Sequence, residues 1–241
     1  ILTLIGQSRL VRGEAYFQQG IRYSMEVTLD DRSHILRGQE TVAYTNNSPD
    51  TLSQLFIHLW PNAYRDENTV LAKMYFNDMD SRFIRHTPDG LGGIDSLDFV
   101  VDGERVVWNY LPDTMDVACL QLNRPLMPGD SLLLETPFRL KFPDAGISRL
   151  GHAGQAYYAT QWYPKPAVYD RQGWHEMPYL DQGEFYSEFG SFDVSITLPE
   201  NYVLAATGNI QTPSEQKWLD EKSKAVYGVN EKMISDNKLY H

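Results

Sequence analysis

Alternation of apolar and polar side chains predicts β-strands in the first part of the chain. In the run YSMEVTL, the odd-numbered residues from Tyr23 to Leu29 share one face, which is the period of two of a half-buried strand. GQETVAYT, residues 38–45, predicts a partner strand after a turn at DDRS. It ends at NNSPD, residues 46–50, which supplies local side-chain hydrogen bonds and a proline-fixed φ. The two runs therefore predict a hairpin.

A long irregular segment follows the next strand. LFIHLW, residues 55–60, is a continuous apolar run and predicts a more deeply buried strand, which Pro61 ends. Asn62 to Gly93 lacks the period of two and carries charges of both signs. We expect a helical turn within residues 68–79 before PDGLGG breaks the chain.

Strand patterns return after this segment. Asp102-Gly103 predicts a tight hairpin turn, because glycine tolerates positive φ. MDVACLQL and DSLLLETPFRL predict two strands joined by a turn at NRPLMPG, residues 123–129. SFDVSITL predicts another strand, followed by a turn at Pro199 and a returning strand over YVLAATG, residues 202–208.

Strands at this spacing, with few helical windows, predict an all-β fold. We expect an antiparallel β-sandwich or a large curved sheet, with one long irregular or partly helical excursion at about residues 62–93. From residue 211 onward the chain is polar and shows neither a strand pattern nor a complete amphipathic helix. We interpret residues 211–241 as a linker.

Composition narrows the class of partner. The 241 residues are 42% hydrophobic, which is enough for one large domain. The 21 basic and 32 acidic residues give a net charge of −11, which repels phosphate backbones, so we expect no nucleic-acid partner. No apolar run reaches the length needed to cross a bilayer, so we expect no transmembrane segment and a soluble chain.

The segment from Tyr157 to Leu180 is unusually rich in aromatic residues. Its sequence, YYATQWYPKPAVYDRQGWHEMPYL, holds five tyrosines, two tryptophans and three prolines in 24 residues. Aromatic rings bury a large apolar area, and prolines fix the backbone between them, so the segment predicts a rigid wall suited to a substrate pocket. The alternative is that these rings cap one end of the hydrophobic core.

This segment resembles part of a known family. TQWYPKP is similar to the Gln-containing strand in the amino-terminal domain of zinc aminopeptidases, the family of aminopeptidase N and leukotriene hydrolase, in the form of their Bacteroidetes-type bacterial branch. The segments Tyr16 to Tyr64 and Phe189 to Gly208 resemble the strands that open and close that domain. The resemblance covers about residues 16–210.

The resemblance implies a fold, a function and partners. Residues 16–210 would be a saddle-shaped β domain that roofs the active-site cleft of a hydrolase, after an N-terminal extension at residues 1–15. Residues 211–241 would lead to a catalytic domain, and the partners would be that domain and the N-terminus of a peptide substrate. The family also implies zinc in the parent enzyme and an exported protein, periplasmic or extracellular.

The resemblance also implies two substrate-binding residues. The glutamine that corresponds to Gln161 lines the pocket for the first residue of the substrate, where its amide oxygen can accept a hydrogen bond from an ammonium group. Two residues on, where many members have an acid or an amide, this chain has Tyr163. A phenol ring leaves only a weaker cation-π contact, which favours an apolar or small first residue over a basic one.

The residues for catalysis by zinc are absent from this sequence. A zinc aminopeptidase needs two histidines at i and i+4 on a helix with a glutamate beside the first, and His175-Glu176 is followed by Pro178 and no second histidine. The six histidines form no i,i+3 or i,i+4 pair, and His58 in its apolar run is expected to be a core or edge histidine with its hydrogen bonds satisfied. Cys119 is expected to be a buried strand residue and not a nucleophile. We therefore predict no catalytic residue and no metal ligand here, and a chain that is inactive alone.

A second class of function is compatible with the same residues. A free-standing β-sandwich could bind a glycan or a peptide by stacking it on an aromatic patch, which would consist of Trp162, Tyr163, Tyr169 and Trp174. A self-contained module is expected to finish on a strand or a cap, whereas this chain finishes in a polar stretch.

Overall fold

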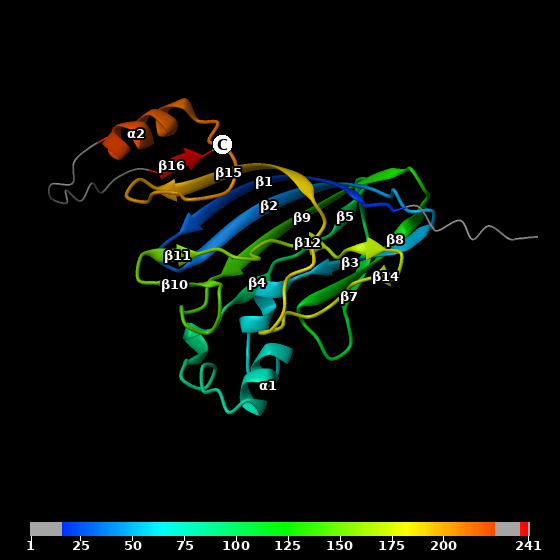
Figure 1. Ribbon diagram of the computed structural model, residues 1–241, viewed down its shortest axis with the longest axis horizontal. Coiled ribbons are helices and arrows are strands. Elements are labelled where there is room, and N and C mark those ends of the chain that lie inside the picture. Colours follow the sequence, from blue (N-terminus) through cyan, green and yellow to red (C-terminus); the bar gives the residue numbers. More distant parts are fainter. Residues whose placement is uncertain (1–15, 225–236, 241) are drawn as a thin grey trace, which may run out of the picture.

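The computed structural model describes residues 16–224 and 237–240. Within these residues the chain is mostly β-strand, with two short α-helices, so the all-β prediction is confirmed. Two principal sheets share one hydrophobic core, and Figure 1 shows the long curved strands of the larger sheet lying side by side along the molecule.

The larger sheet has the strand order β16-β15-β1-β2-β9-β5-β6, and β4 also pairs with β9. Its strands are β1 (Gly20–Asp30), β2 (Ile35–Thr45), β4 (Gly93–Asp95), β5 (Val100–Val101), β6 (Glu104–Arg105), β9 (Ser131–Lys141), β15 (Gly190–Pro199) and β16 (Asn237–Tyr240). Buried and exposed side chains alternate along β1 from Ile21 to Leu29, which is the predicted period of two. The predicted hairpin is confirmed, because β1 and β2 pair antiparallel along their whole length.

The smaller sheet has the order β12-β3-β8-β7. Its strands are β3 (Leu52–His58), β7 (Val107–Tyr110), β8 (Val117–Leu126) and β12 (Lys165–Pro166). Two further ribbons pair β10 (Gly151–Ala153) with β11 (Ala156–Tyr158) and β13 (Tyr169–Asp170) with β14 (Gly173–Trp174). β3 is buried on both faces, as its apolar run predicts: Leu55 and Ile57 lie in the main core, while Phe56 packs in a second cluster on the other side.

The excursion between β3 and β4 is partly helical, as predicted. It contains a 3-10 turn at Trp60–Tyr64, the helix α1 (Val70–Asn77) and a second 3-10 turn at Pro88–Gly90. The Thr69 hydroxyl caps α1 by accepting a hydrogen bond from Ala72 N at 3.2 Å. In Figure 1, α1 lies at the end of the molecule away from α2 (Pro213–Lys224).

Two expectations about strands need correction. β15 pairs with β1 in parallel, so the larger sheet is mixed and not wholly antiparallel. The returning strand predicted over residues 202–208 is absent, and this stretch has no regular structure. Tyr202 and Leu204 pack against the core and Val203 is 59% exposed, but no strand pairs with this stretch in the described residues.

α2 lies in the stretch that we interpreted from its sequence as a polar linker. α2 has no buried residue, so it lacks the apolar stripe by which a helix is recognised in a sequence. Side-chain pairs along its own surface stabilise it instead, including Lys217 with Glu221 at 3.9 Å and Gln216 with Asp220 at 3.0 Å. Neither α1 nor α2 is long and apolar enough to cross a bilayer, and no other α-helix occurs in the described residues.

Candidate functional site

The aromatic segment is attached to the edge of the smaller sheet. β12 pairs with β3, which places Lys165 opposite His58, and Ala167 N donates to Phe56 O at 2.8 Å. Pro164 and Pro166 flank the lysine and restrict its backbone. The pairing turns the Lys165 side chain into the interior, where only 4% of the residue is exposed.

The Lys165 ammonium has a defined set of partners. Its Nζ lies 4.0 Å from the centroid of the Trp60 ring, donates to Ser187 Oγ at 2.9 Å and donates to the Gln161 amide oxygen. No carboxylate of the described residues pairs with it. Burial therefore lowers the pKa of Lys165 to about 7.

His58 lies on the other strand of this pair and stacks on Trp60, with ring centroids 4.2 Å apart. It is 1% exposed, so it is a core histidine as expected. The expectation that it is satisfied is wrong, because neither ring nitrogen has a hydrogen-bond partner in the described residues. Burial, and then the charge of Lys165, lower the pKa of His58 to about 3. The imidazole is therefore neutral at pH 7.

The resemblance implied that Gln161 lies in a strand. The structure places it in a bend between β11 and β12 instead. Its φ is +52°, a left-handed conformation that non-glycine residues seldom adopt. The amide oxygen accepts from Lys165, a residue of the same segment. Sequence reasoning missed this lysine; the signal was a charged residue between two prolines in an otherwise apolar and aromatic run.

Tyr163 has different surroundings from Gln161. Its ring packs edge-on against Tyr23 at 5.5 Å, against Trp162 at 5.2 Å and against Phe192 at 6.0 Å between centroids. Burial raises the pKa of the Tyr163 phenol, so it stays protonated. The Tyr163 ring therefore packs among aromatic side chains of β1, β15 and its own segment.

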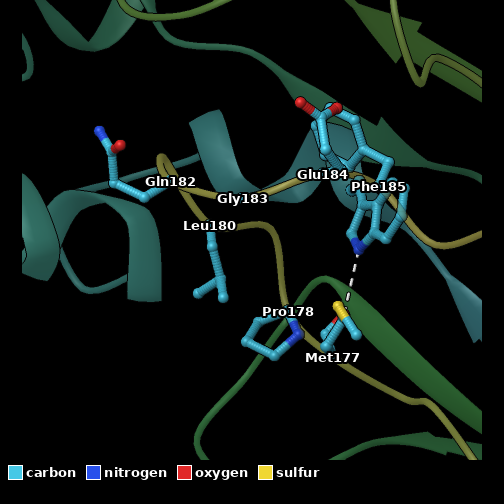
Figure 2. Close-up of a pocket in the computed structure, with 8 residues that line it drawn as sticks. Met177, Pro178, Leu180, Gln182, Gly183, Glu184 and Phe185 are labelled. Carbon is cyan, nitrogen blue, oxygen red and sulfur yellow. Dashed lines mark hydrogen bonds between the residues drawn. The ribbon is translucent and has the colours of Figure 1, made fainter.

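A hollow lies beside Trp60, lined by the loop of residues 177–185 (Figure 2). The Trp60 indole donates to Met177 O at 3.1 Å, which is the dashed line in Figure 2, and the Phe185 ring lies 4.8 Å from the Trp60 ring. Glu184 is exposed at its rim. Trp60 therefore contacts both this hollow and the ammonium of Lys165.

Asp116 anchors the same loop to the smaller sheet. This residue is 4% exposed, and its carboxylate accepts from Tyr179 N at 2.6 Å and from the Thr114 hydroxyl. The Tyr179 hydroxyl in turn accepts from the Tyr64 hydroxyl at 3.0 Å. Burial raises the pKa of Asp116, although its hydrogen bonds act against that rise. The loop is thus held by polar contacts to two other parts of the chain.

The aromatic patch of the second hypothesis is divided into two pairs. Trp162 packs on Tyr163, and Tyr169 on Trp174 at 5.0 Å between centroids; both pairs are edge-on. All four rings are partly buried and packed against the hydrophobic core. None is presented as an exposed flat platform, which is the surface that stacking on a sugar requires.

Metal and nucleophile chemistry find no support in the described part of the chain. It holds no group of three or more histidine, cysteine, aspartate or glutamate side chains arranged to bind a metal ion. His175 and Glu176 lie outside any helix. Cys119 lies half-buried on β8, within 3.6 Å of Gln54 Oε1, and burial raises the pKa of its thiol.

Comparisons with known proteins give structural similarity alone. No family model and no curated protein matches the chain. Among solved structures, it is similar to an M1 zinc metallopeptidase from Deinococcus radiodurans, with 19% identity and a TM-score of 0.47 over 81% of this chain. A mutant of that enzyme bound to a Tyr-Ser-Ala substrate gives 18% identity and a TM-score of 0.46 over the same share. The chain spans 36% of the length of these metallopeptidases, and a likeness at this level assigns it neither a family nor a function.

Proposed function

We propose that this chain is the non-catalytic amino-terminal β domain of a bacterial, exported zinc aminopeptidase. Residues 159–187 would form part of the wall of the active-site cleft and contact the first residue of a peptide substrate. Gln161 and Tyr163 would be the contact residues on this wall.

One observation carries the proposal: the segments that resemble the aminopeptidase domain are neighbours in space. Residues 16–64 supply β1, β2 and β3, and residues 189–208 supply β15, which pairs with β1. TQWYPKP, residues 160–166, joins this unit where β12 pairs with β3. The three segments thus belong to one packed unit, as expected if they were inherited together as a domain.

The chemistry would belong to the rest of the parent enzyme. Zinc there would polarise the scissile carbonyl and activate water, and the sequence in hand has no helix-borne histidine pair to bind it. This chain would contribute binding and the exclusion of water from one side of the cleft.

The first test is an activity assay of the purified 241-residue chain. With alanine p-nitroanilide as substrate and added zinc chloride, we expect no turnover above that of a mock purification. Zinc-dependent turnover that follows the protein through two further columns would contradict the proposal.

The second test is direct binding of a peptide. We expect Ala-Ala-Ala to shift NMR signals of residues 159–187, and Gln161→Ala to weaken this binding about threefold to tenfold, which is the effect of one lost hydrogen bond. Gln172→Ala is the matched control, because Gln172 is an exposed amide of the same segment. A peptide that shifts no signal in residues 159–187 would count against the proposed wall.

A further inference from the structure

The contact between Lys165 and Gln161 determines which end of the glutamine amide faces the ligand. An ammonium group has only N–H donors, so Gln161 meets it with the amide oxygen. The Gln161 Nε2 has no acceptor among the described residues. The part of the amide that remains without a partner is therefore the N–H donor end, while the oxygen is directed toward Lys165.

We infer that Lys165 is a positioning residue that holds the Gln161 oxygen inward, so that the site offers N–H donors to a carbonyl or carboxylate oxygen of the peptide and disfavours its ammonium group. This inference rests on the proposed function and reverses the role expected of Gln161 from the resemblance. In this arrangement the Gln161 amide donates to the backbone carbonyl of the first peptide residue, and groups other than Gln161 bind the peptide amine.

The surroundings of Lys165 make this orientation stable. The ammonium lies on the Trp60 ring and bonds Ser187, and the group that faces it from β3 is the uncharged His58. Because Lys165 forms no ion pair with a carboxylate of the described residues, Gln161 supplies a partly negative oxygen that a buried cation needs. Turning the amide over would place its N–H groups against the ammonium.

The backbone of Gln161 supports the same conclusion. A non-glycine residue at φ +52° persists where its surroundings compensate the strain. The bond to Lys165 is the hydrogen bond that the Gln161 side chain makes within the described residues. The ammonium also repels a second cation at short range, and this adds to the preference for an oxygen of the ligand.

The positioning is tested by NMR on the whole chain, with labelled glutamine and lysine side chains. From pH 5.5 to 9, we expect the Gln161 side-chain amide to titrate together with the Lys165 ammonium, with one midpoint near 7. Lys165→Met should abolish the pH dependence of the Gln161 amide shift. The amide shift of the exposed Gln172 should not change with pH in either protein.

A second variant covers the case in which Lys165→Met fails to fold. Gln161→Glu places a carboxylate against the ammonium, so the Lys165 midpoint should rise by more than one pH unit. The inference would be overturned if the chemical shift of the Gln161 amide did not change as Lys165 titrates and the Lys165 midpoint in Gln161→Glu equalled that of the unaltered chain.

The ligand preference is tested with Ala-Ala-Ala and N-acetyl-Ala-Ala-Ala at pH 6, where Lys165 is charged. We expect the two affinities to agree within about twofold and both peptides to shift the Gln161 amide signal, because the contact is to a carbonyl. Binding that acetylation weakens tenfold or more in the unaltered chain, but not in Gln161→Ala, would show that Gln161 binds the amine and would overturn the inference. An intact Lys165–Gln161 titration with no binding of either peptide would instead contradict the proposed function.

Discussion

Glu40 brings a carboxyl group into the core between the sheets. It is 1% exposed, and neither of its oxygens has a hydrogen-bond partner in the described residues. Burial raises the pKa of Glu40 well above its ordinary value. The folded state therefore holds the proton more tightly than the unfolded state does, and its stability falls as the pH rises above the unfolded pKa of the group.

We predict that Glu40→Met stabilises the protein at pH 7 by about 1–3 kcal/mol, because it removes an unsatisfied polar group from the core. The gain should shrink as the pH falls through the unfolded pKa of about 4.3, because Glu40 then becomes protonated in the unfolded state as well. Urea unfolding at several pH values measures this. Glu40→Gln is the control that removes the charge alone. It should remove the pH dependence of the unfolding free energy but give a smaller increase than Glu40→Met. The interpretation would be contradicted if Glu40→Met raised the unfolding free energy equally at pH 4 and pH 7.

Gly38 allows β2 to pack against a large ring on β9. It lies opposite Phe138, and a Cβ at this position would come within 2.3 Å of the ring. Phe138 is 2% exposed and has little room to move. We predict that Gly38→Ala costs about 1–3 kcal/mol of unfolding free energy, as overpacking does. Gly38→Ala in a Phe138→Leu background should recover most of the loss in urea titrations, and a loss that persists there would exclude this clash as the cause.

The contacts of some single residues could be predicted from the sequence, and those of others could not. The NNSPD cluster predicted local bonds, and Asn46 makes them: its amide donates to Asp50 O at 2.7 Å, and its oxygen accepts from the Ser48 hydroxyl at 2.6 Å. Partners within four residues are set by local geometry. The contact of Lys165 with Trp60 joins residues 105 positions apart, so local patterns carried no sign of it.

At the scale of elements, Asp116 connects the loop of residues 177–185 to the smaller sheet. We predict that Asp116→Ala destabilises the protein by about 1–3 kcal/mol, because Tyr179 N loses its buried acceptor. Hydrogen exchange of residues 177–185 should accelerate more than that of β1. Asp193→Ala is a matched control at an exposed strand position. Uniform acceleration across the chain would show that Asp116 supports the fold and not the loop.

Strands and helices were not equally predictable. β1, β2 and β9 alternate buried and exposed side chains, so their hydrophobic pattern was sufficient. α2 was not recognised because it has no buried residue, so no apolar stripe marks it in the sequence. The stretch of residues 202–208 has a strand-like composition, but no neighbouring strand pairs with it, and an unpaired run does not form a sheet.

At the scale of the whole molecule, both sheets contribute to one core cluster. It contains Val42 and Leu134 of the larger sheet, Ile57 and Leu120 of the smaller sheet, and Leu71 of α1. The two sheets thus bury their inner faces in the same cluster. We therefore expect the described residues to unfold as one cooperative unit.

We predict that urea unfolding followed by far-UV circular dichroism and by tryptophan fluorescence gives coincident midpoints. A Trp218→Phe background restricts the fluorescence to tryptophans that pack on or in the core, since Trp218 lies in α2, which has no buried residue. Midpoints that differ by more than the experimental error would mean that the sheets are independently stable.

The sequence by itself determined the all-β class, the β1–β2 hairpin, the buried β3 run and the partly helical excursion. Each of these features depends on the spacing of apolar residues or on a turn sequence. Both are properties of short stretches of about ten residues, so they can be recognised without knowing the fold. Only the tertiary structure decided the parallel pairing of β15 with β1, the bend at Gln161 and the burial of Lys165 on Trp60. These depend on which distant segments meet in the core, and no local pattern encodes that choice.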